Sequence, residues 1–206
     1  MSIVLLDEFR GSVMRVSREQ ASQNRDRILE IASKRFRETG FGGIGVADLM
    51  KEAGLTHGGF YGHFSSKDDL ASQACAQAFD DKLKMWKEAF DRESDDPIRA
   101  MVAVYLTEAK RDDPGSGCPL AAFGQEVARG PASIRQTFTK GVCSLVDVVA
   151  SVIPGRSKAI KRRKALAVWS TLVGAMVLAR AVDDAELSNE ILKAARIAVT
   201  DLSNAS

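Results

Sequence analysis

The residues of this chain best suited to binding chemistry lie together in residues 56–64, which read THGGFYGHF. Their hydroxyl, phenol and imidazole groups can donate hydrogen bonds, which the phosphate oxygens of nucleic acid accept. Both histidines of the chain, His57 and His63, belong to this stretch. A histidine-based metal cluster or catalytic triad has no further histidine to use, so we expect no metal, no cofactor and no enzymatic activity.

The spacing of two aromatic residues predicts how this stretch is oriented. Phe60 and Phe64 are four residues apart, so in a helix both point to the same side. We expect that side to join a small core with Phe36 and Leu49. The outward face then carries three glycines flanked by two polar rings: Gly58, Gly59 and Gly62, with Tyr61 and His63.

Three glycines in one short helix cost on the order of 1 kcal/mol each relative to alanine. A purely structural helix has little reason to accept that cost, whereas a glycine surface lets a partner approach the backbone closely. The helix N-terminus near His57 favours phosphate, and Lys67 adds a cation beside it. The stretch is therefore predicted to contact DNA; the alternative is that Tyr61 and His63 only pack.

Helical periodicity recurs along the chain without the alternation typical of strands, which predicts an all-α fold of about nine helices. Gly40 and Gly54 are placed to end the first two helices, and Thr56 and Ser66 to cap the third and fourth. The predicted helices span residues 24–39, 46–53, 57–64, 67–90, 97–110, 120–128, 131–152, 157–182 and 188–203.

Two short helices joined by a tight turn at residues 54–56, and packed on a longer first helix, are the outline of a helix-turn-helix. Residues 24–70, which end AGLTHGGFYGHFSSKDDL, resemble the DNA-binding domain of the TetR family of bacterial transcriptional regulators. The run Phe-Tyr-Gly-His-Phe at 60–64, followed by Ser66-Lys67, carries the resemblance.

The resemblance implies a division of roles in which Tyr61, His63 and Lys67 contact phosphates and residues 56–59 approach base edges. Gly45 departs from the family, which usually has Ser or Thr there. Glycine caps a helix adequately but has no hydroxyl, so we expect one phosphate contact fewer. The predicted DNA-binding residues are Arg25, Gly45, Thr56, His57, Gly58, Gly59, Tyr61, His63 and Lys67.

The resemblance also implies three regions: an N-terminal arm at 1–23 that we expect to be poorly ordered, a DNA-binding domain at 24–66, and a ligand-binding and dimerisation domain at 67–206. Translation begins at Met1 or at Met14. We hypothesise the second start because residues 1–13 lack any periodic pattern.

Two apolar stripes rich in small residues occupy the last two predicted helices. Pairing with their copies would make a four-helix interface in a homodimer, and a two-fold dimer suits a palindromic double-stranded DNA operator. The alternative is core packing within one subunit. The predicted interface residues are Ala165, Val168, Leu172, Ala175, Met176, Ala179, Leu192, Ala195, Val199 and Leu202.

Large apolar residues of the middle helices are candidates to line a small-molecule pocket. Few charges occur among them, so we expect an apolar or aromatic ligand rather than a polyanion. Cys118 follows the loop at 111–117 and could sense oxidants or electrophiles if its pKa is lowered. The candidate residues are Met85, Trp86, Phe90, Tyr105, Cys118, Phe123, Phe138 and Trp169.

Charge and cysteine content limit the other possibilities. The net charge is +2, but residues 10–37 hold eight basic and three acidic side chains, a weak pointer to nucleic acid against the alternative of a solvated face. Three cysteines without C-x-x-C spacing predict no disulfide framework or zinc site, and a cytoplasmic location. We expect no membrane span, because no apolar run approaches about 18 residues.

Two basic or glycine-rich strings have simpler explanations. GFGGIG at 40–45 fits the dinucleotide-binding pattern but follows a helix instead of a strand. KAIKRRK at 158–164 is best explained as a solvated helix end. The leading hypothesis is a sequence-specific repressor released from its operator by an apolar or aromatic small molecule. The alternatives are a redox-sensing repressor acting through Cys118 and a ligand-independent DNA-binding protein.

Overall fold

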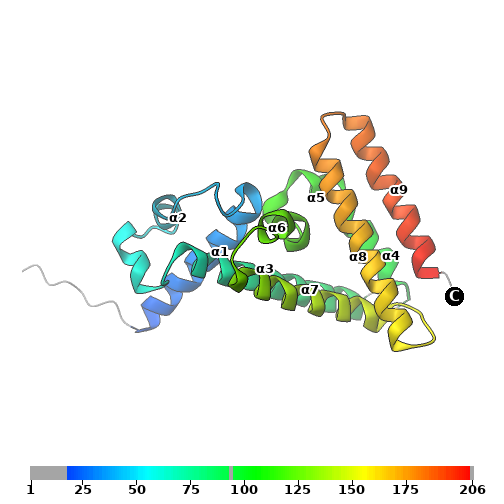
Figure 1. Cartoon of the computed structure of the whole chain (residues 1–206), viewed down its shortest axis with the longest axis horizontal. Coiled ribbons are helices and arrows are strands. Elements are labelled where there is room, and N and C mark those ends of the chain that lie inside the picture. Colours follow the sequence, from blue (N-terminus) through cyan, green and yellow to red (C-terminus); the bar gives the residue numbers. More distant parts are fainter. Residues whose placement is uncertain (1–17, 93–94, 205–206) are drawn as a thin grey trace, which may run out of the picture.

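The computed structural model describes residues 18–92 and 95–204, and the regular structure in them is entirely helical (Figure 1). This confirms the predicted all-α class. The described residues form nine α-helices and two short 3-10 helices. Their bounds are α1 Arg18–Thr39, α2 Val46–Glu52, η1 His57–Gly62, α3 Lys67–Arg92, α4 Pro97–Tyr105, α5 Glu108–Asp112, η2 Pro114–Ser116, α6 Pro119–Val127, α7 Ala132–Val152, α8 Lys158–Ala181 and α9 Ala185–Asn204.

The helices form a head and a body that share the long helix α3. Figure 1 shows α1 and α2 at one end of the molecule and the antiparallel pair α8 and α9 at the other. Helices α3 and α7 run side by side between the two ends, and α6 lies between α1 and α8. The predicted division at residues 66/67 therefore falls at the start of a helix that contacts both α1 and α7.

Helix α1 packs one apolar stripe against the rest of the head, with Ile28, Ala32 and Phe36 fully buried. Gly40 ends it with a left-handed φ of +79°, as predicted. The helix begins at Arg18, so the expectation of a poorly ordered arm up to residue 23 is wrong from residue 18 onward. The rest of the predicted arm and both candidate start residues lie outside the described residues.

The turn between α2 and η1 closes the helix-turn-helix with a glycine cap. Gly54 has φ +71°, and Leu55 N–H donates to the Met50 carbonyl at 2.8 Å while Gly54 N–H donates to that of Lys51 at 3.0 Å. These two bonds form a Schellman motif, which satisfies carbonyls at the end of α2.

Two predicted helices differ in the structure. The stretch predicted as a helix over 57–64 is a 3-10 helix ending at Gly62, because three glycines weaken α-helix propensity and 3-10 geometry suits short pieces. The helix predicted over 97–110 breaks at Leu106, whose ψ is 63°. Thr107 then caps α5 by accepting a hydrogen bond from Lys110 N–H at 3.2 Å.

Gly141 allows α3 and α7 to approach closely. A Cβ at this position would overlap the ring of Phe79, which is buried between the two helices. The ring of Phe138 packs edge-on against Phe79 at 5.4 Å between centroids. The helix pair that joins head and body is therefore held by aromatic packing that needs a glycine opposite it.

The structure corrects the prediction of the dimer interface. Nine of the ten are buried inside one subunit, where α8 and α9 pack on each other and on neighbouring helices, and Leu202 is half-buried. A buried stripe has the same periodicity whether its own chain or a second copy covers it, which is why the alternative of core packing describes these residues.

Helix α8 is long and apolar enough to cross a membrane by length and composition, with a mean hydropathy of 1.3 over 18 residues. This condition differs from the one used in the prediction, which was an uninterrupted apolar run of about 18 residues, and in α8 the run without charge spans 165–179. A core helix passes the same test, and the buried stripe of α8 contacts α6, α7 and α9. Packing within the chain explains the buried stripe of α8, although only 39% of the apolar window is buried.

Candidate DNA-binding surface and ligand cavity

Two buried phenylalanines fix the orientation of η1. Phe60 and Phe64 are 1% and 2% exposed, with ring centroids 5.7 Å apart, whereas Tyr61 is 70% exposed. His57 and Thr56 are also exposed, and His63 is half-buried. The structure thus gives these side chains the orientation predicted from spacing, while their contact with DNA stays a prediction.

The glycines of η1 are not required by packing within the chain. A Cβ at Gly58 or Gly62 would meet no atom within 4 Å, and one at Gly59 would make only ordinary contacts at 3.7 Å. None of the three has a positive φ; among the described glycines only Gly40 and Gly54 do. The absence of an internal reason for these glycines supports the idea that a partner approaches the backbone here.

Gly45 lies at the N-cap of α2, the position that the resemblance to the TetR family implied for it. Its backbone is extended, with φ −82° and ψ 157°, and no side chain caps the helix. Its carbonyl accepts the first helical bond, from Leu49 N–H at 3.1 Å. The helix begins normally, but the site has no hydroxyl to offer a phosphate.

A reciprocal cap fixes the start of α3 and therefore the place of Lys67. The Ser66 hydroxyl accepts a hydrogen bond from Asp69 N–H at 3.0 Å, as predicted. The Asp69 carboxylate in turn accepts from the N–H and the hydroxyl of Ser65, both at 2.9 Å. The bond from Ser65 N–H is the largest cause of the lowered Asp69 pKa, so this cap prefers a charged carboxylate.

Arg25, predicted to contact DNA, is occupied within the chain. Its guanidinium lies 5.2 Å from the centroid of the Phe64 ring and donates a hydrogen bond to the Gln73 side chain. Gln73 donates to Asp69 at 2.7 Å. Arg25 of α1 therefore connects Phe64, which follows η1, with Gln73 of α3, a role that only the tertiary structure reveals.

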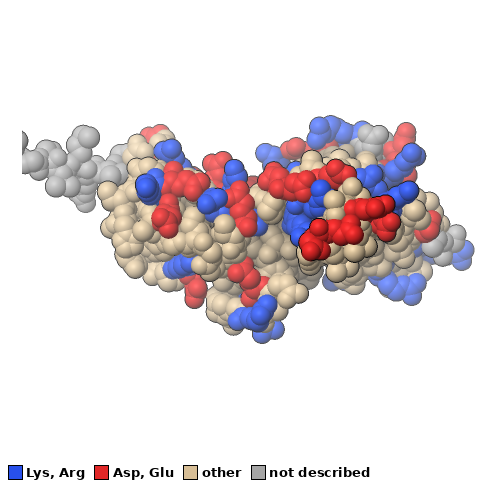
Figure 2. All heavy atoms as spheres, turned by 90° about the horizontal axis from the view of Figure 1, so that it is seen from above, with Lys and Arg blue, Asp and Glu red and all other residues tan. Residues whose placement is uncertain are grey.

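The basic bias of the N-terminal region is also partly used internally. Arg35 pairs with Glu38 at 2.5 Å and with Glu52 at 3.3 Å, and Arg37 donates to the Gly115 carbonyl at 2.7 Å. On the face shown in Figure 2, basic and acidic side chains are interspersed over both head and body. The charge bias therefore adds little to the case for DNA binding, which rests on η1.

The body contains a small cavity between α3, α4 and the start of α6. Its volume is about 20 Å³, room for about one water molecule. Four predicted residues meet there: Met85, Trp86, Tyr105 and Cys118. The cavity is also lined by Met176, which was predicted for the dimer interface, and by four residues that the sequence did not single out, namely Lys82, Val104, Lys110 and Gly117.

The other four predicted pocket residues do not line this cavity; they pack against neighbouring rings. The physical reason is that a large aromatic side chain fills space wherever a core needs volume. The observed ring pairs are Phe90 with Trp86 at 5.9 Å, Phe123 with Phe41 at 4.9 Å, Phe138 with Phe79 at 5.4 Å and Trp169 with Tyr105 at 6.0 Å.

Two lysines that were not predicted from the sequence give the cavity a charged side. Lys82 donates to the Ser116 carbonyl at 2.7 Å, and Lys110 to the Ser116 hydroxyl at 3.1 Å. Burial, and then the nearby charge of Lys110, lower the pKa of Lys82. Its spacing of three and four residues from Met85 and Trp86 on α3 was the available signal, since such residues share a helix face.

The head is similar in sequence to known proteins. Residues 28–74 match the sequence profile described as "Bacterial regulatory proteins, tetR family". The HTH-type transcriptional repressor DhaR of Mycobacterium sp. (strain GP1) is 27% identical over 104 residues, which are 50% of this chain and 52% of DhaR. This chain carries the DNA-binding domain of the TetR family.

A second relative matches a shorter region. The HTH-type transcriptional regulator AcrR of Shigella flexneri is 34% identical over 59 residues, which are 29% of this chain and 27% of AcrR. The chain thus spans about half the length of curated relatives such as DhaR, and less of AcrR. The profile match places the TetR similarity at residues 28–74.

Solved structures extend the likeness to the body. Reduced NemR of E. coli aligns with a TM-score of 0.72 and 19% identity, covering 87% of this chain and 96% of NemR. A TetR family transcriptional regulator from Agrobacterium tumefaciens aligns with the same TM-score and 22% identity, covering 86% of this chain and 98% of its own. At this identity the likeness shows the fold, which is that of TetR-family regulators.

Cys118 occupies a particular place in this TetR-family fold, the N-cap of α6. It is 8% exposed, and burial raises the pKa of its thiol, although the nearby Tyr105 hydroxyl, the N–H groups of Leu120 and Ala121 and the charge of Lys82 act in the opposite direction. The lowered pKa that sensing would require is therefore absent in this conformation.

The TetR head contacts the body at two places near the cavity. Glu126 of α6 accepts Phe41 N–H through both carboxylate oxygens, at 3.1 and 3.0 Å, and the Phe41 ring stacks on Phe123. Arg37 binds η2 through the Gly115 carbonyl. Both α6 and η2 adjoin Cys118, so structural changes at the cavity have short routes to the head.

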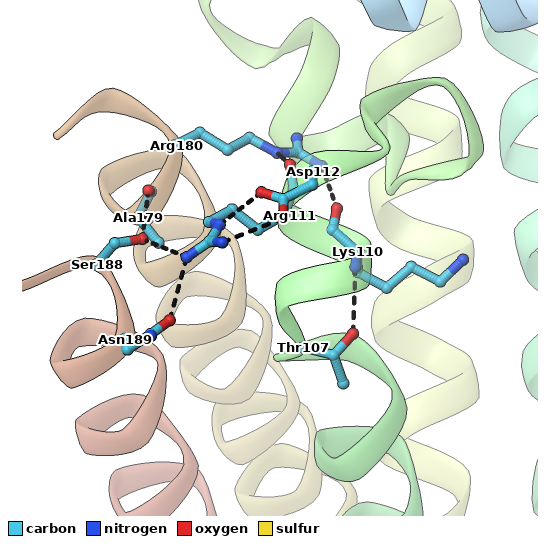
Figure 3. A network of polar contacts seen from close by, with 8 residues as sticks. All are labelled: Thr107, Lys110, Arg111, Asp112, Ala179, Arg180, Ser188 and Asn189. Atoms are coloured by element: carbon cyan, nitrogen blue, oxygen red, sulfur yellow. Dashed lines mark hydrogen bonds and ion pairs between the residues drawn. The ribbon is translucent and has the colours of Figure 1, made fainter. Parts of the chain in front are cut away.

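A network on the far side of η2 anchors α5 to the C-terminal helices (Figure 3). Arg180 of α8 donates to the carbonyls of Arg111 and Lys110, at 3.0 and 2.7 Å. Arg111 donates to Ser188 and Asn189 of α9, at 3.0 and 3.1 Å. One wall of the cavity is thereby tied to the helices at the far end of the body.

Proposed function

We propose that this chain is a transcriptional repressor that binds a palindromic operator in the cytoplasm and is released from it by a small molecule. The observation that carries the DNA-binding part is the surface of η1, where Tyr61 is exposed beside glycines that no internal contact requires. Phosphate contacts by Tyr61, His63 and Lys67 would position the head, and His57 is the main side chain available to read bases.

Repression is supported by one relative, DhaR, which is a transcriptional repressor. The direct experiment is selection of bound DNA from a random pool, followed by footprinting. Protection of one palindromic sequence supports a sequence-specific regulator. Weak preference spread over many sequences would favour the alternative of a ligand-independent DNA-binding protein.

The dimer surface is proposed on the faces of α8 and α9 that the chain leaves exposed. Leu178 of α8 is 56% exposed and Ile197 of α9 is 57% exposed. Gly174, exposed in the middle of α8, has no atom within 4 Å of a Cβ position. A mid-helix glycine costs on the order of 1 kcal/mol relative to alanine, and close approach of a second copy gives a reason for it.

Sedimentation analysis tests this dimer. The wild-type chain is expected to be a dimer at micromolar concentration, and Leu178→Glu and Ile197→Glu to be monomeric, because a buried unpaired charge is costly at an interface. Gln136→Glu adds the same charge on the exposed surface of α7 and should stay dimeric. A monomeric wild type would refute the proposed dimer.

The effector is proposed to bind the cavity lined by Trp86, Tyr105 and Met176. The support is its place beside η2 and α6, the two elements that contact the head. A ligand that fits one arrangement of these elements better than another would shift the spacing of the two heads in a dimer. Screening compounds for release of the selected DNA tests this step.

Sensing through Cys118 is the second candidate. The observation in its favour is the position of Cys118 in the cavity, at the N-cap of α6 and within reach of the charge of Lys82. Electrophile-induced DNA release that is fully retained in Cys118→Ser would remove this candidate.

A further inference from the structure

The Tyr105 hydroxyl is a buried polar group without a hydrogen-bond partner among the described residues. The side chain is 6% exposed and lines the cavity. Burial, and then the neighbouring Cys118 thiol, raise the pKa of Tyr105, but the geometry between the hydroxyl and the thiol sulfur is not that of a hydrogen bond. A buried donor without an acceptor costs free energy, which an acceptor on a bound ligand would recover.

The remaining polar groups of the cavity are also donors. Lys82 and Lys110 each bond a neutral oxygen of Ser116, and each ammonium has three N–H groups. Among residues 18–92 and 95–204, no Asp or Glu lines the cavity. Asp81, whose charge influences Lys82, lies outside the lining, and neither lysine forms an ion pair with a described carboxylate.

The orientation of Lys110 keeps its charge on the cavity side. In Figure 3 its carbonyl accepts from Arg180, while its ammonium points away from Arg180 and Arg111. Asp112, which pairs with Arg111 at 2.7 Å, therefore does not neutralise it, and Asp113, whose pKa the charge of Lys110 helps to lower, forms no ion pair with it among the described residues. The polar side of the cavity presents one hydroxyl donor and two cations.

The opposite side of the cavity is apolar and can move. Met85, Trp86 and Met176 form this side, and Val104, 49% exposed, lies at its rim. Methionine side chains are flexible and adapt to irregular shapes. Because the cavity now holds about 20 Å³, a ligand must displace these side chains or the lysines to enter.

We propose that the effector is an organic anion, a carboxylate on an aromatic or aliphatic body, whose charged group binds Tyr105, Lys82 and Lys110. This inference rests on the proposed function in taking the cavity as the effector site. The ligand expected from the sequence was apolar or aromatic. The proposed ligand also carries a negative charge, because Lys82 and Lys110 line the cavity together with the predicted apolar residues. Charge-assisted hydrogen bonds to a carboxylate are stronger than the present bonds to neutral oxygens.

Binding of such an anion also gives a route to the head. To reach the carboxylate, Lys82 and Lys110 exchange their bonds to Ser116 for bonds to the ligand. The preceding residue, Gly115, accepts the hydrogen bond from Arg37 of α1, and α1 and η2 are in extensive contact. Release of η2 by the lysines therefore alters the support of the helix that carries the head.

Calorimetric titration of the full chain without DNA tests the ligand class. The probes are benzoate, 3-phenylpropanoate and octanoate, each compared with its neutral amide. The expected result is that at least one carboxylate binds about tenfold or more tightly than its amide. A smaller preference for every pair, or no binding of any carboxylate at about 10 mM, overturns the proposal.

Variants then locate the bound anion. Tyr105→Phe removes a hydroxyl without breaking a described hydrogen bond, so it should leave stability unchanged or slightly higher while weakening carboxylate binding about tenfold. Lys82→Met should abolish the preference for the carboxylate, and Lys84→Met, exposed on the same helix, should keep it. Wild-type binding in both Tyr105→Phe and Lys82→Met overturns the proposal. No DNA is present, so a failure to bind any operator would be seen separately.

Discussion

Glu126 on α6 holds the backbone N–H of Phe41, in the turn after α1, with both of its carboxylate oxygens. A Cβ on the neighbouring Gly40 would lie 2.6 Å from the same carboxylate, so the left-handed glycine also makes room for it. The Phe41 ring stacks on Phe123, one turn before Glu126 on the same helix. The head is therefore joined to the body by a polar and an apolar contact from a single helix.

Glu126→Ala is expected to lower the free energy of unfolding by about 1–3 kcal/mol, because a half-buried N–H loses a charged acceptor. Hydrogen exchange of the Phe41 amide should become faster. Glu126→Gln keeps an acceptor oxygen and should fall between wild type and alanine. Denaturant titration checks the order; equal stability of all three would show that the contact contributes nothing.

Alanine at Tyr61, His63 or Lys67 is expected to weaken binding to every DNA sequence by a similar factor, because phosphate contacts carry no sequence information. Lys67→Ala should also reduce the slope of log affinity against log salt by about 0.9, one released counterion. Lys87→Ala, exposed on α3 away from the head, is the charge control. Fluorescence anisotropy at several salt concentrations measures both quantities, and a slope unchanged in Lys67→Ala contradicts the phosphate assignment.

Gly45→Ser is expected to tighten DNA binding and to stabilise α2 by a few tenths of a kcal/mol, since serine is the better cap. The backbone there suits any residue, with φ −82°, and the nearest atom to a new Cβ is Asp48 Oδ2 at 3.4 Å. Gly45→Ala has the same Cβ without the hydroxyl. If alanine improves affinity as much as serine, the hydroxyl is not the cause.

The local features of the head could be predicted from the sequence, because they depend on neighbours along the chain. The orientation of Phe60 and Phe64 follows from their spacing, and the caps at Gly40, Gly54 and Ser66 follow from residue type. Contacts between distant segments could not be predicted in this way. Nothing in the sequence near Phe41 points to an acceptor 85 residues later.

The other errors have one cause: the sequence indicates that a residue is buried but does not indicate which residues cover it. The stripe containing Leu172 and Met176 was rightly predicted to be buried, but its period does not say which helix covers it. The same holds for Phe123, whose size suggested a cavity wall and whose partner is a ring of the head. The charge of Lys82 favoured an exposed position and outweighed its spacing from two cavity residues of α3, and only the folded chain brings Ser116 to it.

Gly141→Ala is expected to destabilise the chain by about 1–3 kcal/mol, because the new methyl group overlaps the Phe79 ring inside a packed core. Gly124→Ala, also within a helix, places its Cβ 3.9 Å from Phe138 and should instead be neutral or stabilise by up to about 1 kcal/mol. Thermal unfolding of both variants distinguishes packing from helix propensity. Equal effects of the two substitutions would contradict the close fit of α3 and α7.

Iodoacetamide is expected to label Cys143 first, because it is the exposed cysteine of the three. Burial raises the pKa of Cys118, and that of Cys75 to about 12, so at neutral pH both are protonated thiols that react slowly. Labelling of Cys118 should speed up as the pH rises, since only the thiolate attacks. Peptide mass spectrometry at several pH values measures the order, and faster labelling of Cys118 than of Cys143 at neutral pH would favour the sensor hypothesis.

The stacking of Phe41 on Phe123 has a consequence for modular engineering of regulators. If the head were exchanged between two such proteins at residue 66, Phe41 would come from one protein and α6 from the other. The residues that pack together between head and body would then no longer match. A working chimera must therefore transplant the facing residues of α6, Phe123 and Glu126, along with the head. In this protein the unit that can be exchanged is larger than the unit that touches DNA.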